Sequence, residues 1–192
     1  MKEMFLLVIG GSGSGKSAYA EECACAVSEK GRLYYLAAMQ ACDEESVRRI
    51  ERHRRLRSGK GFWTIEQPVG IEKALAQMTE DHTDGTEGKR RATALLECVS
   101  NLTANEMFAK EGIRTCEETT ERVVRGVMEL GEQLENLIVV TNNVAEDGVP
   151  YDETTRAYLE ALGAINENLA GMADRVVEVV SGIPVVLKDG GE

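Results

Sequence analysis

Four residues near the start of the chain have the types and the spacing of a phosphate-binding loop. Gly10, Gly15, Lys16 and Ser17 occupy the fixed positions of the pattern G-x-x-x-x-G-K-S/T within GGSGSGKS. Glycines allow the backbone to curl with its N–H groups turned inward, where they bind phosphate oxygens. We expect the Lys16 ammonium to reach the terminal phosphates of a nucleoside triphosphate, and the Ser17 hydroxyl to bind Mg²⁺.

The sequence around this loop supplies the context that such a match requires. Residues 4–9 (MFLLVI) form an apolar run typical of a buried strand, and residues 17–29 have the pattern of a helix. A helix that starts at the loop directs its N-terminus at the bound anion. The alternative is a Gly/Ser-rich turn that binds nothing, and the order strand, loop, helix disfavours it.

The second candidate is His53, which lies in the basic segment RRIERHRRLR. Six arginines in residues 48–57 reverse the local sign of charge in a chain whose net charge is −11. Neighbouring positive charges disfavour an imidazolium and so favour a neutral, nucleophilic ring, while guanidinium groups neutralise phosphate oxygens. This arrangement suits attack by His53 on a nucleotide α-phosphate. A helix with a solvated basic face is an alternative that spacing alone does not exclude.

Two acidic residues end predicted strands. Glu97 lies at the end of the predicted buried strand 92–98, where P-loop enzymes normally carry an Asp that acts on Mg²⁺ directly or through water. Because Glu is one methylene longer than Asp, Glu97 could bind the metal or accept a hydrogen bond from the nucleotide sugar. A third alternative is an acid that is merely exposed at the strand end. Glu66 ends the short segment 62–66 with the same ambiguity.

Strand and helix patterns alternate along the rest of the chain. The predicted strands are 32–38, 62–66, 92–98, 137–141 and 175–180, and the predicted helices are 42–57, 70–79, 101–110, 115–134 and 152–172. A hairpin of 176–180 with 184–187 is expected to turn at Ser181 and Gly182. We therefore predict an α/β fold of the P-loop NTPase, RecA-like class, with a mostly parallel central sheet flanked by helices and a C-terminal antiparallel hairpin. Ligands of such sheets bind at the carboxyl ends of the strands, so the candidate residues should converge there.

Length and charge restrict the function further. The 192 residues suit one nucleotide-binding catalytic domain, residues 1–192. A net charge of −11 disfavours binding to nucleic acid and to anionic membranes. The chain has no apolar run of transmembrane length and no signal-peptide flanks, so we expect a cytoplasmic protein.

Six stretches, taken in order, resemble one family. They are VIGGSGSGKSAYAEE, LYYLAAMQACDEESVRRIERHR, FWTIEQP, ALLECVSNLTANEMF, VVTNNVAEDGVP and AINENLAGMADRVVEVVSGIPVVLK. The family is the bifunctional adenosylcobinamide kinase / adenosylcobinamide-phosphate guanylyltransferase of cobalamin biosynthesis. The segments RI-x-x-H and N-x-x-LA-x-x-AD-x-V-x-x-V-x-G are much more specific than the loop alone.

This resemblance implies two reactions. A nucleoside triphosphate, ATP or GTP, phosphorylates the aminopropanol arm of adenosylcobinamide, and GMP is then transferred from GTP through a GMP–histidine intermediate, giving adenosylcobinamide-GDP and pyrophosphate. The matching histidine is His53, with Lys16 as the second catalytic residue. The resemblance also implies a homo-oligomer, often a trimer. The resemblance implies that Glu66 and Glu97 contact the guanosine part, and the Mg²⁺ roles of Ser17 and Glu97 rest on the loop pattern and the strand-end position given above. The residues implied at the nucleotide are Gly10, Gly11, Ser12, Gly13, Ser14, Gly15, Lys16, Ser17, Ala38, Met39, Gln40, Arg54, Arg55, Leu56, Arg57, Glu66 and Glu97.

The chain departs from the family pattern at several places. Gly13 stands where the family has a loop arginine, Asn143 stands for an acid and Ala145 for a glycine. The segment 57–63 (RSGKGFW) is slightly longer than usual and lacks a proline. These departures leave open whether both activities are kept. Another P-loop small-molecule kinase without a covalent intermediate, and a nucleotide-binding regulatory protein, are the alternatives.

Overall fold

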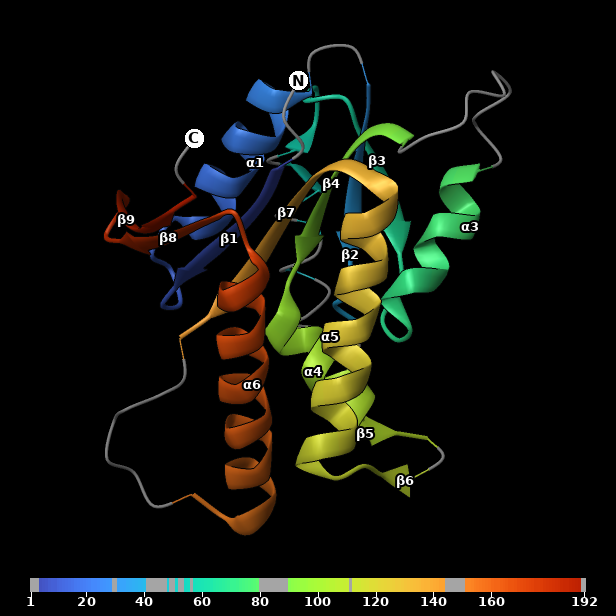
Figure 1. The fold of residues 1–192 in the computed structure, drawn as a ribbon, viewed down its shortest axis with the longest axis vertical. Coiled ribbons are helices and arrows are strands. Elements are labelled where there is room, and N and C mark those ends of the chain that lie inside the picture. Colours follow the sequence, from blue (N-terminus) through green and yellow to red (C-terminus); the bar gives the residue numbers. More distant parts are fainter. Residues whose placement is uncertain are drawn as a thin grey trace.

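A seven-stranded sheet forms the centre of the molecule (Figure 1). The computed structural model describes residues 4–28, 31–40, 57–79, 90–110, 112–143 and 151–190, together with residues 48, 51, 54 and 55. The sheet strands are β1 (Met4–Gly10), β2 (Arg32–Ala37), β3 (Phe62–Glu66), β4 (Arg90–Glu97), β7 (Leu134–Asn142), β8 (Arg175–Val180) and β9 (Ile183–Asp189). Their order across the sheet is β3-β2-β4-β7-β1-β8-β9.

Helices follow most of these strands. They are α1 (Lys16–Val27), η1 (Ile71–Lys73, a 3₁₀ turn), α3 (Ala74–Thr79), α4 (Val99–Met107), α5 (Cys116–Gln133) and α6 (Glu153–Met172). Two short strands, β5 (Phe108–Ala109) and β6 (Gly112–Ile113), pair separately as an antiparallel hairpin. No helix in the described ranges has both the length and the apolar character needed to cross a membrane.

The sheet is covered on both faces, which explains its nearly continuous apolar strands. Successive side chains of a strand point to opposite faces. In β1, Leu6 and Val8 pack with residues of α1, whereas Leu7 packs with the cluster that includes residues of α4, α5 and α6. Figure 1 shows α5 and α6 together on one side of the sheet, with α1 apart from them. Each helix layer therefore has its own apolar core.

All strand pairs of the main sheet except β8–β9 are parallel. The predicted α/β class, the mostly parallel sheet and the C-terminal hairpin are confirmed. Because the strands are parallel, the carboxyl ends of β1, β2, β3, β4 and β7 meet at one edge of the sheet, where the predicted site residues follow them.

Some predicted boundaries are wrong in detail. The helix expected at 70–79 is divided into η1 and α3, after Gly70 with φ 58°. The helix expected at 101–110 spans Val99–Met107, and the chain then enters the β5–β6 hairpin. Most of the helix expected at 42–57 lies outside the described residues. Those described within it, at positions 48, 51, 54, 55 and 57, are helical.

Candidate nucleotide-binding site

The loop between β1 and α1 has a conformation that depends on glycine. Gly13 and Gly15 have φ values of 72° and 93°, in the left-handed region that other residues rarely adopt. The Ser14 amide donates to the Gly11 carbonyl at 3.2 Å and closes a turn. The helix α1 then begins at Lys16 without a side-chain cap. The N–H groups of its first turn are therefore available to an anion.

The turn of the β8–β9 hairpin supports this loop from outside. The Gly182 amide donates to the Ser14 carbonyl at 2.7 Å. Where the loop begins, a Cβ added to Gly10 would lie only 2.7 Å from the Val179 carbonyl oxygen. The loop and the hairpin thus approach so closely that a larger residue at Gly10 would displace backbone. The hairpin was predictable from the sequence, but this contact was not.

Lys16 lies against the loop that it follows. The residue is 8% exposed, and its Nζ donates to the Gly11 carbonyl at 3.0 Å. The ammonium is therefore held over the loop by the backbone that would surround a phosphate group. That it reaches the terminal phosphates of a nucleotide stays a prediction of the sequence pattern.

Ser17 and Glu97 meet at the carboxyl ends of β1 and β4. The Ser17 hydroxyl donates to Glu97 Oε1 at 2.8 Å. The other oxygen, Oε2, is buried and has no hydrogen-bond partner among the described residues, although the residue as a whole is half-buried. Burial raises the pKa of Glu97 to about 7, and the hydrogen bond from Ser17 and the charge of Lys16 oppose that rise. A hydroxyl beside a carboxylate with an unused oxygen is a donor set that fits Mg²⁺.

The segment that follows β2 lies beside Glu97. The Ala38 amide donates to the Glu97 carbonyl at 3.0 Å, and Asn105 donates from its side chain to the Ala38 carbonyl at 2.8 Å. Ala38 is buried, Met39 is half-buried and Gln40 is exposed. The structure therefore brings the backbone of this segment to the loop site, while the Gln40 side chain is open to solvent.

The described arginines of the basic segment divide into two kinds. Arg54 and Arg55 are exposed, and Arg54 forms an ion pair with Glu66. Glu66, whose side chain is 64% exposed, is thus paired at the edge strand β3 and makes no described contact with the loop. Arg57, in contrast, is 7% exposed. His53 and Leu56, both assigned to the site from the sequence, lie outside the described residues.

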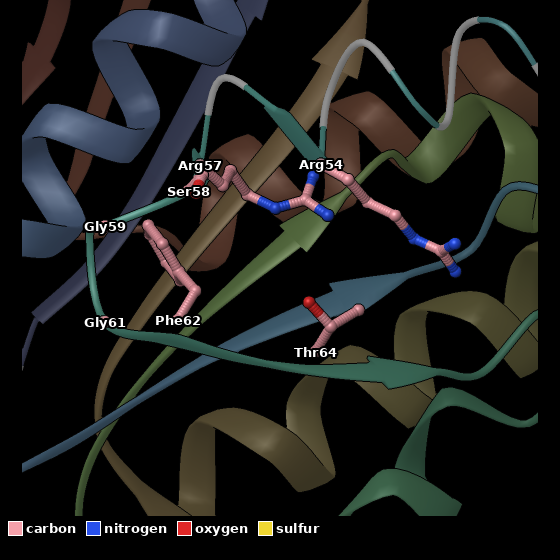
Figure 2. A pocket seen from close by; sticks show the side chains of 7 residues that line it. All are labelled: Arg54, Arg57, Ser58, Gly59, Gly61, Phe62 and Thr64. Carbon is pink, nitrogen blue, oxygen red and sulfur yellow. The ribbon is translucent and has the colours of Figure 1, made fainter.

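The buried arginine borders a pocket of about 480 Å³ beside β3 (Figure 2). Its guanidinium carbon lies 3.3 Å from the centroid of the Tyr35 ring. Figure 2 shows the Arg57 side chain extending from the turn over the strands, with Phe62 and Thr64 below it. The lining residues are Arg54, Arg57, Ser58, Gly59, Gly61, Phe62 and Thr64.

The end of β7 carries the family departure at Asn143. Its side-chain amide donates to Glu178 Oε1 on β8 at 2.7 Å. An acid in its place would face another carboxylate, so the asparagine is compatible with Glu178 in this chain. Ala145 lies outside the described residues.

Three site residues were not found by sequence reasoning. In the sequence, Tyr35 has the pattern of an ordinary buried strand residue. In the structure, the Arg57 guanidinium stacks on its ring. Lys60 Nζ donates to Glu21 Oε2 at 2.5 Å, and Glu21 is only 3% exposed. A lysine in the turn SGKG could have suggested an ion pair that holds the turn in place. Nothing in the sequence identified Glu21, 39 positions earlier, as its partner.

A mostly parallel sheet, a phosphate loop after β1, and an acid at the end of β4 that accepts from the loop serine define a P-loop nucleotide-binding protein. An ATPase domain of known structure has the same fold, with a TM-score of 0.56 and 12% identity over 98% of this chain and 78% of that one.

The family follows from sequence comparison. Residues 6–187 match the CobU family, cobinamide kinase / cobinamide phosphate guanyltransferase. The chain belongs to this family of enzymes, as the sequence motifs predicted. It is 29% identical to the bifunctional adenosylcobalamin biosynthesis protein CobU of Escherichia coli, over 96% of this chain and all of that protein. It is 30% identical to the CobP protein of the same description from Pseudomonas aeruginosa, over 95% of this chain and 96% of that one.

Proposed function

We propose that this chain catalyses two consecutive reactions on a cobinamide. It first transfers the terminal phosphoryl group of ATP or GTP to the hydroxyl of the aminopropanol arm of adenosylcobinamide. It then transfers GMP from GTP to the resulting phosphate. The observation that carries the proposal is the Ser17–Glu97 contact beside Lys16, because it joins the phosphate loop to the acid of a neighbouring strand in a chain that belongs to the cobinamide kinase family.

In the kinase step, the loop and Lys16 hold the phosphates. The inward N–H groups and the α1 N-terminus bind phosphate oxygens. The Lys16 ammonium stabilises the negative charge that develops on these oxygens in the transition state. Ser17 and Glu97 would hold Mg²⁺, which when bound neutralises phosphate charge. The substrate hydroxyl oxygen forms a bond to the γ-phosphorus and gives up its proton to solvent, the bond to the bridging oxygen breaks, and ADP or GDP leaves.

In the guanylyl step, His53 acts as the nucleophile. A ring nitrogen forms a bond to the α-phosphorus of GTP, the bond to the bridging oxygen breaks, and pyrophosphate leaves. A phosphate oxygen of adenosylcobinamide phosphate then attacks the same phosphorus and displaces the histidine nitrogen. Adenosylcobinamide-GDP and free His53 result. We place this chemistry in one catalytic domain, residues 1–192. The homo-oligomeric state stays an expectation from the family resemblance, and the cytoplasmic location stays a prediction from the sequence.

Nucleotide labelling tests the histidine step. The purified chain is incubated with GTP that carries radioactive α-phosphate, and separately with GTP labelled at the γ-phosphate. We expect an acid-labile label from the α-position only, because a phosphoramidate is cleaved by acid. His53→Ala should remove the label while nucleotide affinity is largely kept. Addition of adenosylcobinamide phosphate should discharge the label into adenosylcobinamide-GDP.

The same preparation distinguishes the alternatives. Equal labelling of His53→Ala would contradict the histidine mechanism. ATP-dependent phosphorylation of a substrate without any label would indicate a P-loop kinase that makes no covalent intermediate. Nucleotide binding without turnover, with or without adenosylcobinamide, would indicate a regulatory protein. Separate assays for the phosphate and GDP products show whether both activities are present despite Gly13 and Asn143.

A further inference from the structure

The Arg57 guanidinium is a buried cation with unused hydrogen-bond donors on two of its nitrogen atoms, as far as the described residues go. Arg57 is 7% exposed. Its Nε and Nη1 atoms are buried and have no hydrogen-bond partner in that part of the chain. Burying a charge is costly unless the charge is paired and hydrogen-bonded. The donors are therefore arranged for an anion that the described chain does not supply.

The ring of Tyr35 fixes where this guanidinium lies. Tyr35 is on β2, is 3% exposed, and has the Arg57 guanidinium carbon 3.3 Å from its ring centroid. The Phe62 ring packs against it edge-on, with centroids 5.9 Å apart and planes at 86°. A flat aromatic face held in this way is a platform on which a guanidinium stacks while its N–H edge stays free to donate.

The turn after Arg57 is tied to the helix that carries the phosphate loop. Lys60 Nζ donates to Glu21 Oε2 on α1 at 2.5 Å, and the Lys60 amide donates to the Arg57 carbonyl at 3.0 Å. Since α1 begins at Lys16, this tether connects the arginine turn to the same element that positions the lysine.

Strand register also places the Tyr35 platform beside the loop site. In the pairing of β2 with β4, Tyr35 lies opposite Leu95 and Ala37 lies opposite Glu97. Glu97 in turn accepts from the Ser17 hydroxyl at 2.8 Å. The platform and the acid of the loop site therefore lie on neighbouring strands, two residues apart along each strand.

We propose that Tyr35 and the Lys60–Glu21 ion pair are positioning groups that aim Arg57 at the phosphate oxygens of the bound nucleoside triphosphate. The loop GGSGSGKS itself has one lysine and no arginine, so Arg57 adds the second cation to the phosphate site from a different part of the chain. This assignment rests on the proposed function, and it identifies the residues that hold Arg57 in position to bind phosphate.

Rescue by guanidinium ion tests the platform. Arg57→Ala is expected to weaken GTP affinity about ten- to a hundredfold, the range for hydrogen bonds to charged groups. Millimolar guanidinium chloride should restore at least half of that loss on a logarithmic scale, because the Tyr35 face remains. The double variant Arg57→Ala/Tyr35→Phe keeps the ring and should keep the rescue. The double variant Arg57→Ala/Tyr35→Leu should lose it.

A second pair of variants tests the tether. Lys60→Gln is expected to weaken GTP affinity about tenfold, because a displaced charge contacts phosphate poorly. Lys60→Arg keeps the ion pair with Glu21 and should behave like wild type. Arg125→Ala, at an exposed arginine of α5, is the matched control for loss of a positive charge and should change affinity little. Sodium chloride at equal concentration controls for ionic strength.

Equal rescue with leucine and with phenylalanine at position 35 would overturn the platform. Unchanged GTP affinity in Arg57→Ala would overturn the phosphate role, and equal affinities of Lys60→Gln and Lys60→Arg would overturn the tether. Only variants with cooperative thermal unfolding are compared, and Tyr35→Met replaces a leucine variant that does not fold. Because the readout is GTP affinity, a ring-dependent rescue without histidine labelling would support the positioning groups and contradict only the guanylyl step.

Discussion

The cations of the two parts of the candidate site are satisfied differently. In the loop part, Lys16 Nζ donates to the Gly11 carbonyl, and Ser17 donates to Glu97, whose other oxygen is buried and has no partner among the described residues. In the arginine part, two nitrogen atoms of the Arg57 guanidinium have no partner among the described residues. The loop backbone therefore holds the lysine, whereas in our proposal a nucleotide phosphate supplies the partner of the arginine.

The two parts also differ in how the fold holds them. The loop joins a central strand to a helix, and the hairpin turn at Gly182 supports it through Ser14. Arg57 lies before the edge strand β3 and depends on one ring and one ion pair. Changes in the loop should therefore affect chemistry and stability together, whereas changes around the arginine should mainly affect ligand affinity.

The largest effect is expected for Lys16→Ala. It removes the cation that we propose to act on the nucleotide phosphates. Turnover of the nucleotide should therefore fall about a hundred- to a thousandfold, as when one preorganised group is lost from other active sites. Lys110→Ala, an exposed lysine after α4, is the control and should leave turnover unchanged. Steady-state nucleotide hydrolysis or transfer measures both. Similar rates for the two variants would contradict a special role of the loop lysine.

The same comparison explains what the sequence could predict. The loop part could be predicted because its pattern lies in eight consecutive residues. Glu97 could be predicted because it lies at the end of a buried strand. The arginine part is not local. Six arginines in residues 48–57 look alike in the sequence, and the burial of Arg57 depends on a ring from β2.

The fold was predictable for a related reason. Apolar strands alternate with amphipathic helices, and the hydrophobic pattern that identifies each element lies within that element's own residues. The division of residues 70–79 was missed because it depends on Gly70 and on the buried Glu106, whose Oε1 accepts from the Gly70 amide at 2.6 Å. Contacts between distant segments, such as Lys60 with Glu21 and Gly182 with Ser14, have no sequence period and were not predicted.

A smaller, pH-dependent effect is expected at Glu97. Burial raises its pKa from 4.5 to about 7, so the folded chain favours the protonated form. The associated stability is fully present below about pH 4.5 and is lost as the pH rises through about 7. At pH 8 without Mg²⁺, the ionised group should lower the free energy of unfolding by on the order of 2 to 3 kcal/mol.

Glu97→Gln isolates this contribution from the other titrating groups. The free energies of unfolding of wild type and variant, measured by denaturant titration between pH 5 and 8 with a chelator, should diverge as the pH rises, in favour of the variant. Added Mg²⁺ should reduce the divergence at pH 8 in wild type, because it stabilises the carboxylate. A difference that stays constant with pH would mean that Glu97 ionises normally.

The smallest effect is expected for Gly10→Ala, which tests the support of the loop by the hairpin. A Cβ at this position would lie 2.6 Å from Ser14 Oγ and 2.7 Å from the Val179 carbonyl oxygen. The serine side chain can rotate, but the Val179 carbonyl belongs to β8, so loop and hairpin must separate. We expect a loss of about 1 to 2 kcal/mol in the free energy of unfolding, as for other overpacked sites.

Gly11→Ala is the matched variant for stability, because nothing lies within 4 Å of a Cβ built there. Its free energy of unfolding should change far less than that of Gly10→Ala, although both replace a glycine of the same loop. GTP affinity should fall in Gly10→Ala together with stability, since the hydrogen bond from Gly182 to Ser14 depends on the same approach. If the two variants unfold alike, the hairpin does not support the loop, and the loop part of the site would be held by β1 and α1 alone.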